Sequence, residues 1–467
     1  MKPIHFHHHG AAALKDMDMT SGPLLKKLIA VSLPLAFSGI LQLLFNAADL
    51  IVIGQFSETS TQSLAAVSSN VALINLVINV VIGLSIGTNV VMSQAIGAKD
   101  ENRAQNTVHT SVLLSLISGV AVGLIGVFCA RYFLVWMKTD PAILDKATDY
   151  LFIYFIGTPA NVLYNFGASI LRSVGDTKRP LYFLTISGLV NVVLNLVLVI
   201  VFHMGVAGVA YATIISQILS AVMVIVYMMK SKDCVRFVPK NMRIYGDKLK
   251  KMLYIGLPAG FQGTVFSLSN VVIQSAVNSF GSLVMAGNGA ASSLEGFTYT
   301  AMNSVYQASL TFVGQNVGAK KYDRINKVQG VCLVLVTIIG LVFGVTTYCL
   351  GEPLLSIYLP NDPEAIPYGI IRMSYIALPY FLCGMMEVMV GGQRGMGMSF
   401  IPMINALLGS CVLRIVWIST VFAADPTLFT LYISYPISWI VTTLAHTVFY
   451  FIKLHSLKKK ARLEAGN

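Results

Sequence analysis

Long apolar runs alternate with short polar segments along almost the whole chain. Each run reaches or exceeds the roughly 20 residues that a helix needs to cross the hydrocarbon of a bilayer. A helix satisfies its backbone hydrogen bonds within its own segment, as the lipid interior requires. The pattern therefore predicts an all-α integral membrane protein with twelve transmembrane helices, at residues 28–54, 64–96, 108–130, 147–171, 181–203, 207–229, 252–279, 283–317, 328–350, 366–393, 401–424 and 428–452.

A short motif occurs twice. The segment "SQAIGAKDENR" at 93–103 is followed 221 residues later by "GQNVGAKKYDR" at 314–324. Prolines repeat at nearly the same offset, which stays between 220 and 224, and they pair Pro34 with Pro258, Pro159 with Pro379 and Pro180 with Pro402. Two six-helix lobes related by a pseudo-two-fold axis along the membrane normal explain this repeat, and such repeats commonly build transporters.

The repeat also predicts the domain boundaries. We expect an N-terminal cytoplasmic tail at 1–24, an N-lobe of helices 1–6 at 25–229, a cytoplasmic linker at 230–251, a C-lobe of helices 7–12 at 252–453 and a basic cytoplasmic tail at 454–467. The linker is long enough to follow a movement of the lobes. Gly97 and Gly318 are expected to end their helices in left-handed geometry, with the following lysine near the negative end of the helix dipole.

Charge is scarce and unevenly placed. Charged residues make up 11% of the chain, against about 25% in soluble domains. The net charge of +12 is concentrated in alternate loops, above all in 230–251, whereas the opposite loop 351–365 is acidic. This positive-inside bias places both termini in the cytoplasm and argues against nucleic-acid binding. The six cysteines show no C-x-x-C spacing, and the histidines of "MKPIHFHHHG" are interpreted as a mobile tail or tag remnant.

Polar residues inside the first lobe's spans are candidates for ion coupling. Gln42, Asn46 and Asp49 share one helical face, which we expect to point into the bundle. Asn191 and Asn195 are one turn apart on helix five, and Thr213 on helix six lies at a similar depth. A carboxylate, amide oxygens and a hydroxyl can coordinate Na⁺ or reorganise when the carboxylate is protonated. The alternative is that these groups only hold helices together.

The second lobe contains two intramembrane acids. Glu295 lies near the middle of helix eight and Glu387 near the inner end of helix ten, where either is a candidate for contact with a cationic substrate. The alternative is a structural ion pair, with Arg394 and Arg414 as the available partners. Adaptable side chains that suit a cavity wall are Met285, Tyr299, Met302 and Tyr306.

The motifs resemble those of the multidrug and toxic compound extrusion (MATE) family. The resemblance rests on "SQAIGAK", "LRSVGDTKRP", "NVVLN", "GVAGVAYATIISQ", "TFVGQNVGAKK" and "QRGMGMSFIP", and it covers about Leu25 to Leu457. It implies two V-shaped lobes and an antiporter that exports organic cations or drugs in exchange for H⁺ or Na⁺. It also implies an N-lobe coupling site at Asp49, Asn191, Asn195 and Thr213. Many members carry N-x-x-L-D in helix five, where this chain has Asn195.

Other function classes fit the sequence less well. A flippase for lipid-linked oligosaccharides has the same fold and is the alternative, but it needs a cavity rich in Arg and Lys, and only Arg372 and Arg414 fall within spans. The chain contains no HExxH, GxSxG or Walker motif, so we expect no enzyme activity and no cofactor. The expected partners are small organic cations, H⁺ or Na⁺, and lipids. We expect a monomer in the bacterial cytoplasmic membrane.

Overall fold

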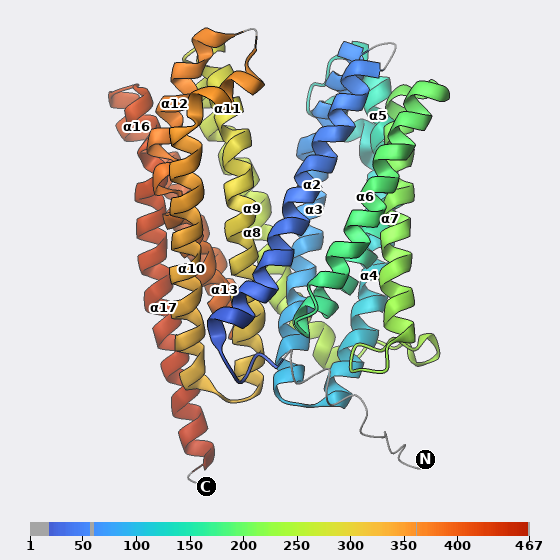
Figure 1. The fold of residues 1–467 in the computed structure, drawn as a ribbon, viewed down its shortest axis with the longest axis vertical. Helices are drawn as coiled ribbons and strands as arrows, with labels where there is room; N and C mark the ends of the chain where they lie inside the picture. Colours follow the sequence, from blue (N-terminus) through green and yellow to red (C-terminus); the bar gives the residue numbers. More distant parts are fainter. Residues whose placement is uncertain (1–17, 57–59, 361, 466–467) are drawn as a thin grey trace. The chain divides into compact units, whose positions relative to one another are not determined.

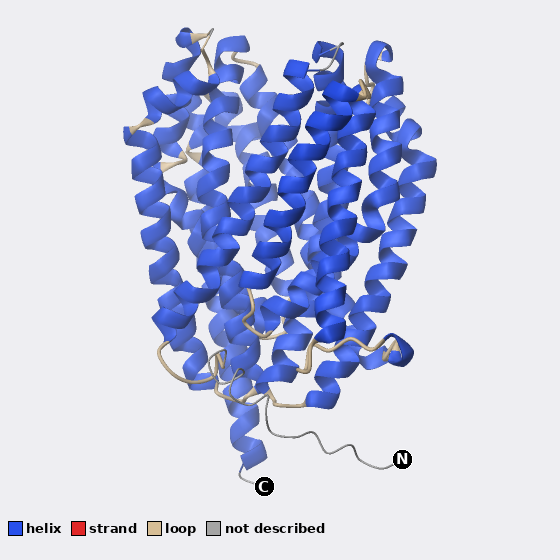
Figure 2. Ribbon diagram, turned by 45° about the vertical axis from the view of Figure 1, so that its right-hand side comes forward, coloured by secondary structure: helices blue, strands red, loops and turns tan. Residues whose placement is uncertain are grey.

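The structure, a computed structural model, describes residues 18–56, 60–360 and 362–465. Every regular element among these residues is helical (Figure 2). All twelve expected spans fall on helices, which confirms the all-α membrane fold. Nine stretches of the described chain are long and apolar enough to cross a membrane by length and composition. The other three expected spans form α5, α8 and α9. The histidines of the N-terminal tail lie outside the described residues.

The chain divides into two compact units. Unit 1 extends to Leu253 except for two short stretches, Leu35–Ile40 and Ile78–Leu84, which belong to unit 2, and unit 2 continues from Tyr254. The helices that begin in the first half of the chain (Figure 1) are α2 (Leu24–Phe56), α3 (Ser60–Gly97), α4 (Glu101–Trp136), α5 (Pro141–Ser173), α6 (Lys178–Leu196) with the π-helical turn η1 (Val197–Val201), and α7 (Gly205–Lys230).

The second half repeats this order with more interruptions. Its elements are α8 (Gly246–Asn278), α9 (Ser282–Gly318), α10 (Tyr322–Cys349), α11 (Gly351–Tyr358), η3 (Pro363–Ala365), α12 (Ile366–Tyr375), η4 (Leu378–Tyr380), α13 (Phe381–Gly395), α14 (Phe400–Ala406), the π-helical η5 (Leu407–Val412), α15 (Leu413–Trp417), the π-helical η6 (Ile418–Phe422), α16 (Leu428–Tyr432) and α17 (Ser434–Ala465). Helix ten breaks between α12 and α13, where Pro379 supplies no backbone N–H for the helical ladder.

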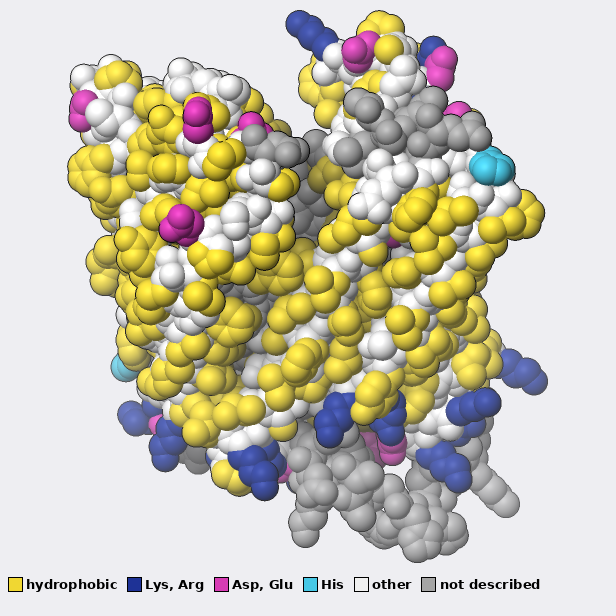
Figure 3. Space-filling view, turned by 45° about the horizontal axis from the view of Figure 1, so that its top comes forward, with side chains coloured by type: hydrophobic (Ala, Val, Ile, Leu, Met, Phe, Trp, Pro, Cys, Tyr) yellow, Lys and Arg dark blue, Asp and Glu magenta, His cyan; other side chains and the backbone are white. Residues whose placement is uncertain are grey.

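Each unit buries its own apolar side chains and exposes many others. Met92, Val108 and Leu171 are among the residues that fill one core of unit 1, and Ile273, Met386 and Tyr432 are among those that fill one core of unit 2. Large apolar side chains also cover much of the outer surface (Figure 3). Most of the lysines and arginines visible in that view gather at one end, beyond the apolar surface. This distribution suits helices surrounded by lipid and bounded by charged loops.

The middle part of the linker packs against α4, so its length is not all free to follow a movement. Val235 and Phe237 are buried in the core of unit 1. The Val238 N–H donates to His109 Nε2 over 3.3 Å. The Tyr245 N–H donates to Thr110 Oγ1 over 3.1 Å, immediately before α8 begins. Buried apolar side chains and paired backbone groups hold this segment on the helix.

The repeated loop is a helix cap built the same way twice. Lys99 and Lys320 have left-handed backbones, whereas Gly97 and Gly318 are the last helical residues of α3 and α9. The expectation that these glycines adopt the left-handed conformation is therefore wrong, because in each case the left-handed residue lies two positions further along the chain. The N–H groups of the residues that follow the two lysines donate to the carbonyls of Ala95 and Asn316, as in a Schellman cap.

Candidate functional site

Asp49 is the centre of a small polar site in unit 1. It lies near the end of α2 and accepts a hydrogen bond from Asn195 Nδ2 of α6. The same Nδ2 also donates to Asn191 Oδ1 over 3.3 Å. Asn195 is fully buried and Asn191 nearly so, whereas Asp49 is half-buried. The fold thus brings together an acid and two amides that lie more than 140 residues apart in the sequence.

The remaining expected members of this site are placed differently. Thr213 of α7 donates its hydroxyl to the Val209 carbonyl of its own helix over 2.9 Å. Gln42 and Asn46 are exposed, and the described part of the chain offers them no hydrogen bond. They share a helical face with Asp49, but of these three residues only Asp49 forms a hydrogen bond with a described residue of α6. The structure therefore brings together Asp49, Asn191 and Asn195.

Two tyrosines that the sequence analysis did not single out lie beside this site. Tyr150 and Tyr154 of α5 are nearly buried, with ring centroids 6.4 Å apart and near-parallel rings. Tyr150 is close enough to Asp49 to interact with its charge. A Tyr-x-x-x-Tyr spacing places both rings on one helical face, but this pattern alone is common in packed helices. Only the fold shows that the pair borders an acid.

Asn195 has one buried group that the site leaves unsatisfied. Its Oδ1 is enclosed and has no hydrogen-bond partner among the described residues. Such a group costs about 1–3 kcal/mol when buried in a protein. It lies on the same amide that binds Asp49, so a carboxylate oxygen and a free amide oxygen are neighbours. Oxygens of these two types suit a hard cation, and the free acceptor equally suits a protonated carboxyl group.

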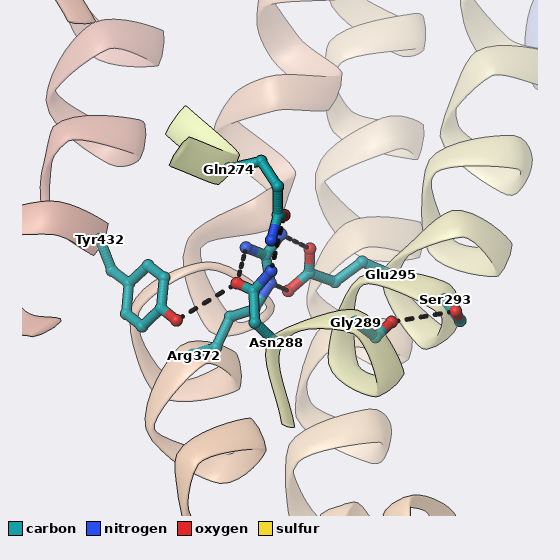
Figure 4. Close-up of polar contacts among 7 residues, drawn as sticks. All are labelled: Gln274, Asn288, Gly289, Ser293, Glu295, Arg372 and Tyr432. Atoms are coloured by element: carbon teal, nitrogen blue, oxygen red, sulfur yellow. Dashed lines mark hydrogen bonds and ion pairs between the residues drawn. The ribbon is translucent and has the colours of Figure 1, made fainter. Parts of the chain in front are cut away.

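Glu295 in unit 2 belongs to a satisfied ion pair. Arg372 of α12 binds it through Nε at 3.1 Å and Nη2 at 2.7 Å, and both side chains are buried (Figure 4). Arg372 Nη1 also donates to Asn288 Oδ1 over 2.7 Å. The hydroxyl of Tyr432 donates to the same oxygen, and Asn288 Nδ2 donates to Gln274 Oε1. The network extends over four helices.

This network corrects the expected partners of Glu295. Neither Arg394 nor Arg414 pairs with it. Arg394 donates instead to Tyr306 and Gln262, and Arg414 donates to Ser438. A bidentate pair with Arg372 neutralises the Glu295 carboxylate, which leaves it little charge to attract a cationic substrate. The sequence analysis missed Arg372 as the partner because the two residues lie 77 positions apart, and only the packing of α12 against α9 brings them together.

Glu387 of α13 is the second intramembrane acid of unit 2, and it differs from Glu295 in its contacts. It is half-buried, and no described residue forms a hydrogen bond or ion pair with it. Arg394, two turns further along, is its nearest basic neighbour but directs its guanidinium to Tyr306 and Gln262. Tyr299 also lies close to Glu387. An unpaired intramembrane carboxylate is a candidate functional group.

The expected cavity wall is only partly present. Met285 and Tyr299 are exposed by 39% and 38%, so both are available to a ligand. Met302 is 1% exposed and packs against Gly340 and Gly384, and Tyr306 is 4% exposed and accepts a hydrogen bond from Arg394. These last two side chains are core residues, because tight helix packing at the glycines needs their volume. Within the described ranges no three His, Cys, Asp or Glu residues form a metal cluster.

Comparisons with known proteins agree with the fold and with the repeat. The MatE family model matches twice, at residues 34–197 and 258–419. A probable multidrug resistance protein of Bacillus subtilis is 30% identical over 401 residues, which cover 86% of this chain and 89% of that protein. An FAD transporter of Shewanella oneidensis is 24% identical over 366 residues, which cover 76% and 79%.

A solved structure of MATE in the bent conformation matches with a TM-score of 0.88 and 20% identity, over 96% of this chain and 99% of that one. This likeness shows the fold. The family match covers well over half of the chain, and it includes the helices that carry Asp49 and Asn195. The chain therefore belongs to the MATE family of multidrug efflux transporters, whose members are transporters and not enzymes.

Proposed function

We propose that the protein is a secondary antiporter of the bacterial cytoplasmic membrane that exports small organic cations in exchange for H⁺ or Na⁺. The observation that carries this proposal is the pairing of Asp49 with Asn195 on two apolar helices of unit 1. An acid inside a membrane span is costly to keep and is usually functional. The basic loops at one end support an orientation with both termini in the cytoplasm.

The amide of Asn195 provides a simple way to sense the charge on Asp49. An ionised carboxylate only accepts hydrogen bonds, and Asn195 Nδ2 supplies one while its Oδ1 stays unsatisfied. A protonated carboxyl group donates, and rotation of the same amide would present Oδ1 to it. A bound Na⁺ would likewise take a carboxylate and an amide oxygen. Each state calls for a different arrangement of α2 and α6.

One carboxylate at this site sets the expected stoichiometry. Asn195 stands where the resemblance to the family implies an acid, so Asp49 provides the only carboxylate among the described residues that form this site. One H⁺ or Na⁺ neutralises it, and we expect one coupling cation per transport cycle.

The second half of the proposal concerns Glu387, whose carboxylate has no partner among the described residues and suits the positive group of an exported cation. The pairing of Glu295 with Arg372 favours Glu387 over Glu295 in that role.

The test is gradient-driven efflux by purified protein in liposomes. A cationic dye is loaded, and a pH gradient or a Na⁺ gradient is imposed separately. Asp49→Asn keeps the shape of the side chain and removes its charge, so we expect gradient-driven transport to be lost while dye binding remains. Asp145→Asn is the matched control, because Asp145 is an exposed acid of unit 1 that pairs with Arg131. Transport by Asp49→Asn at the wild-type rate under both gradients would contradict the proposal.

A further inference from the structure

Arg414 is a buried guanidinium of unit 2 without a counterion among the described residues. It lies on the short helix α15, between the π-helical segments η5 and η6. Its neighbours Ile415 and Val416 are exposed, whereas Arg414 itself is 5% exposed and faces inward. π-helical turns inside α-helices occur frequently at functional sites because they reposition side chains. The proposed transport mechanism does not use this residue.

The contacts of Arg414 orient it but leave most of its donors free. Nε donates to Ser438 Oγ over 2.8 Å. The guanidinium carbon lies 4.2 Å from the ring centroid of Tyr435 and 5.7 Å from that of Trp439. No described residue accepts a hydrogen bond from Nη1 or Nη2, and neither nitrogen is an enclosed orphan. Both nitrogens therefore reach accessible space.

The electrostatic surroundings of Arg414 differ from those of Arg372 in the same unit. Arg372 is neutralised by Glu295 and also binds Asn288. Two tyrosines and two cysteines are close enough to interact with the charge of Arg414, namely Tyr435, Tyr380, Cys383 and Cys411. No Asp or Glu of the described chain lies within ion-pair distance of it. A buried cation of this kind is costly to keep unless an anion joins it.

In the internal repeat, the position of Arg414 corresponds to the region of the two amides beside Asp49 in unit 1. When Pro180 is aligned with Pro402, Asn191 falls on Leu413, the residue before Arg414. The π-helical η1 follows Asn195, just as η6 follows α15. The same stretch of the repeat therefore carries the two amides beside Asp49 in unit 1 and, in unit 2, a guanidinium that pairs with no described acid.

We propose that Arg414 is an anion-binding point for the carboxylate or phosphate of an exported aromatic compound. Its free nitrogens form a planar fork that matches an oxyanion with two hydrogen bonds. The partly exposed rings of Tyr380 and Tyr435 flank Trp439, at centroid distances of 5.4 Å and 5.8 Å, and offer surfaces for an aromatic group. This inference rests on the proposed export function and extends its substrates from cations to zwitterions and aromatic anions.

Binding is measured with the full-length protein in nanodiscs of neutral lipid and without any ion gradient. Trp439 serves as the reporter after Trp136→Phe and Trp417→Phe replace the other two tryptophans. Riboflavin phosphate is compared with riboflavin, and naphthoate with its methyl ester, by quenching or perturbation of Trp439 fluorescence. Each pair differs by one oxyanion. We expect each anion to bind at least about tenfold more tightly than its partner, as a charge-assisted hydrogen bond predicts.

Substitutions separate recognition of the oxyanion from general packing. Arg414→Gln should make the two members of each pair bind equally and leave riboflavin and the ester unchanged. Arg414→Lys should keep part of the preference and serves as the readout if Arg414→Gln does not fold. Ser410→Ala, in η5 about one turn before Arg414, should change neither the preference for the anion nor the affinity for the uncharged ligands. Equal affinity of the wild-type protein for both members of each pair, or an equal loss of all ligands in Arg414→Gln, overturns the proposal.

A lipid headgroup offers the same phosphate chemistry, so the titration is repeated in nanodiscs that contain phosphatidylglycerol. Unchanged affinity for riboflavin phosphate supports a small-molecule site. A loss of about tenfold or more assigns Arg414 to the lipid and overturns the inference. Because no gradient is needed, a failure here leaves the role of Asp49 standing, and a failure of Asp49 leaves the binding result standing.

Discussion

Lys99 and Lys320 adopt the same left-handed backbone, with φ angles of 55° and 56°, at the ends of α3 and α9. A side chain with a Cβ atom is disfavoured in this conformation, and glycine is the usual residue at this place in a helix cap. The corresponding caps after α5 and α13 use Gly175 and Gly397. The protein thus keeps lysine at two strained caps.

We predict that Lys99→Gly stabilises the protein by about 1 kcal/mol, because glycine removes the steric cost of the left-handed backbone. The measurement is thermal unfolding of the purified protein in detergent, where a higher midpoint is expected. Lys99→Ala is the control, since it removes the charge but keeps the Cβ atom, and it should give no gain. A lower midpoint for Lys99→Gly than for Lys99→Ala would show that the backbone is not strained there.

The ion pair of unit 2 gives a prediction about stability. Glu295→Gln leaves Arg372 buried without its counterion and should destabilise the protein by about 3–5 kcal/mol. The double substitution Glu295→Gln with Arg372→Gln removes both charges and should cost less than the single one. The midpoint of unfolding in a denaturant series measures both.

Glu387→Gln is the matched control for that series. Glu387 is an acid of the same unit but has no partner among the described residues, so its replacement should change stability by less than about 1 kcal/mol. Additive costs for Glu295→Gln and Arg372→Gln would mean that the two side chains do not act as a pair.

A second acid beside Asp49 should change the pH dependence of transport. Asn195→Asp places two carboxylates where an amide now binds one, and two adjacent carboxylates compete for a proton. We expect the rate of efflux under a fixed gradient to depend on pH over a wider range than in the wild type. Asn165→Asp adds an acid to α5, where the native amide bonds its own helix at Asn161, and serves as the control. An unaltered profile in Asn195→Asp would remove Asn195 from the coupling site.

The docked linker can be followed through Cys234. Burial, with a smaller effect of Asp233, raises the pKa of its thiol to about 11. The reactive thiolate is therefore scarce at neutral pH and grows as the pH rises towards 11. A protein with Cys234 as its single cysteine should react with a maleimide far more slowly at pH 7 than one with only the exposed Cys349.

Loosening the linker should expose this thiol. Gln105→Ala removes the hydrogen bond that Gln105 donates to the Cys234 carbonyl, and it should raise the rate of labelling several-fold. The rate is read by mass spectrometry at a series of pH values. If Cys234 and Cys349 were labelled equally fast in otherwise wild-type protein at pH 7, the linker would not be docked on α4 in solution.

Much of this protein follows from its sequence because the membrane imposes strict local rules. Apolar runs of sufficient length must become helices in lipid, so the twelve spans could be predicted one by one. The repeated Gln, Gly, Lys and Pro positions revealed the duplication, since chance does not preserve polar residues at one offset. Asp49 could be singled out by itself, because a charge within a span is rare enough to carry meaning without any neighbour.

The tertiary structure decided which polar groups meet. Gln42 and Asn46 share the face of Asp49, yet only the crossing of α2 with α6 determines that Asp49 reaches Asn195. The pairing of Glu295 with Arg372 depends on the packing of α12 against α9, which brings together two residues 77 positions apart in the sequence. Arg414 became a candidate only when the described residues around it proved to include rings and thiols but no acid within ion-pair distance. Helical periodicity predicts which face a side chain occupies, but its partners depend on how helices from distant parts of the chain cross.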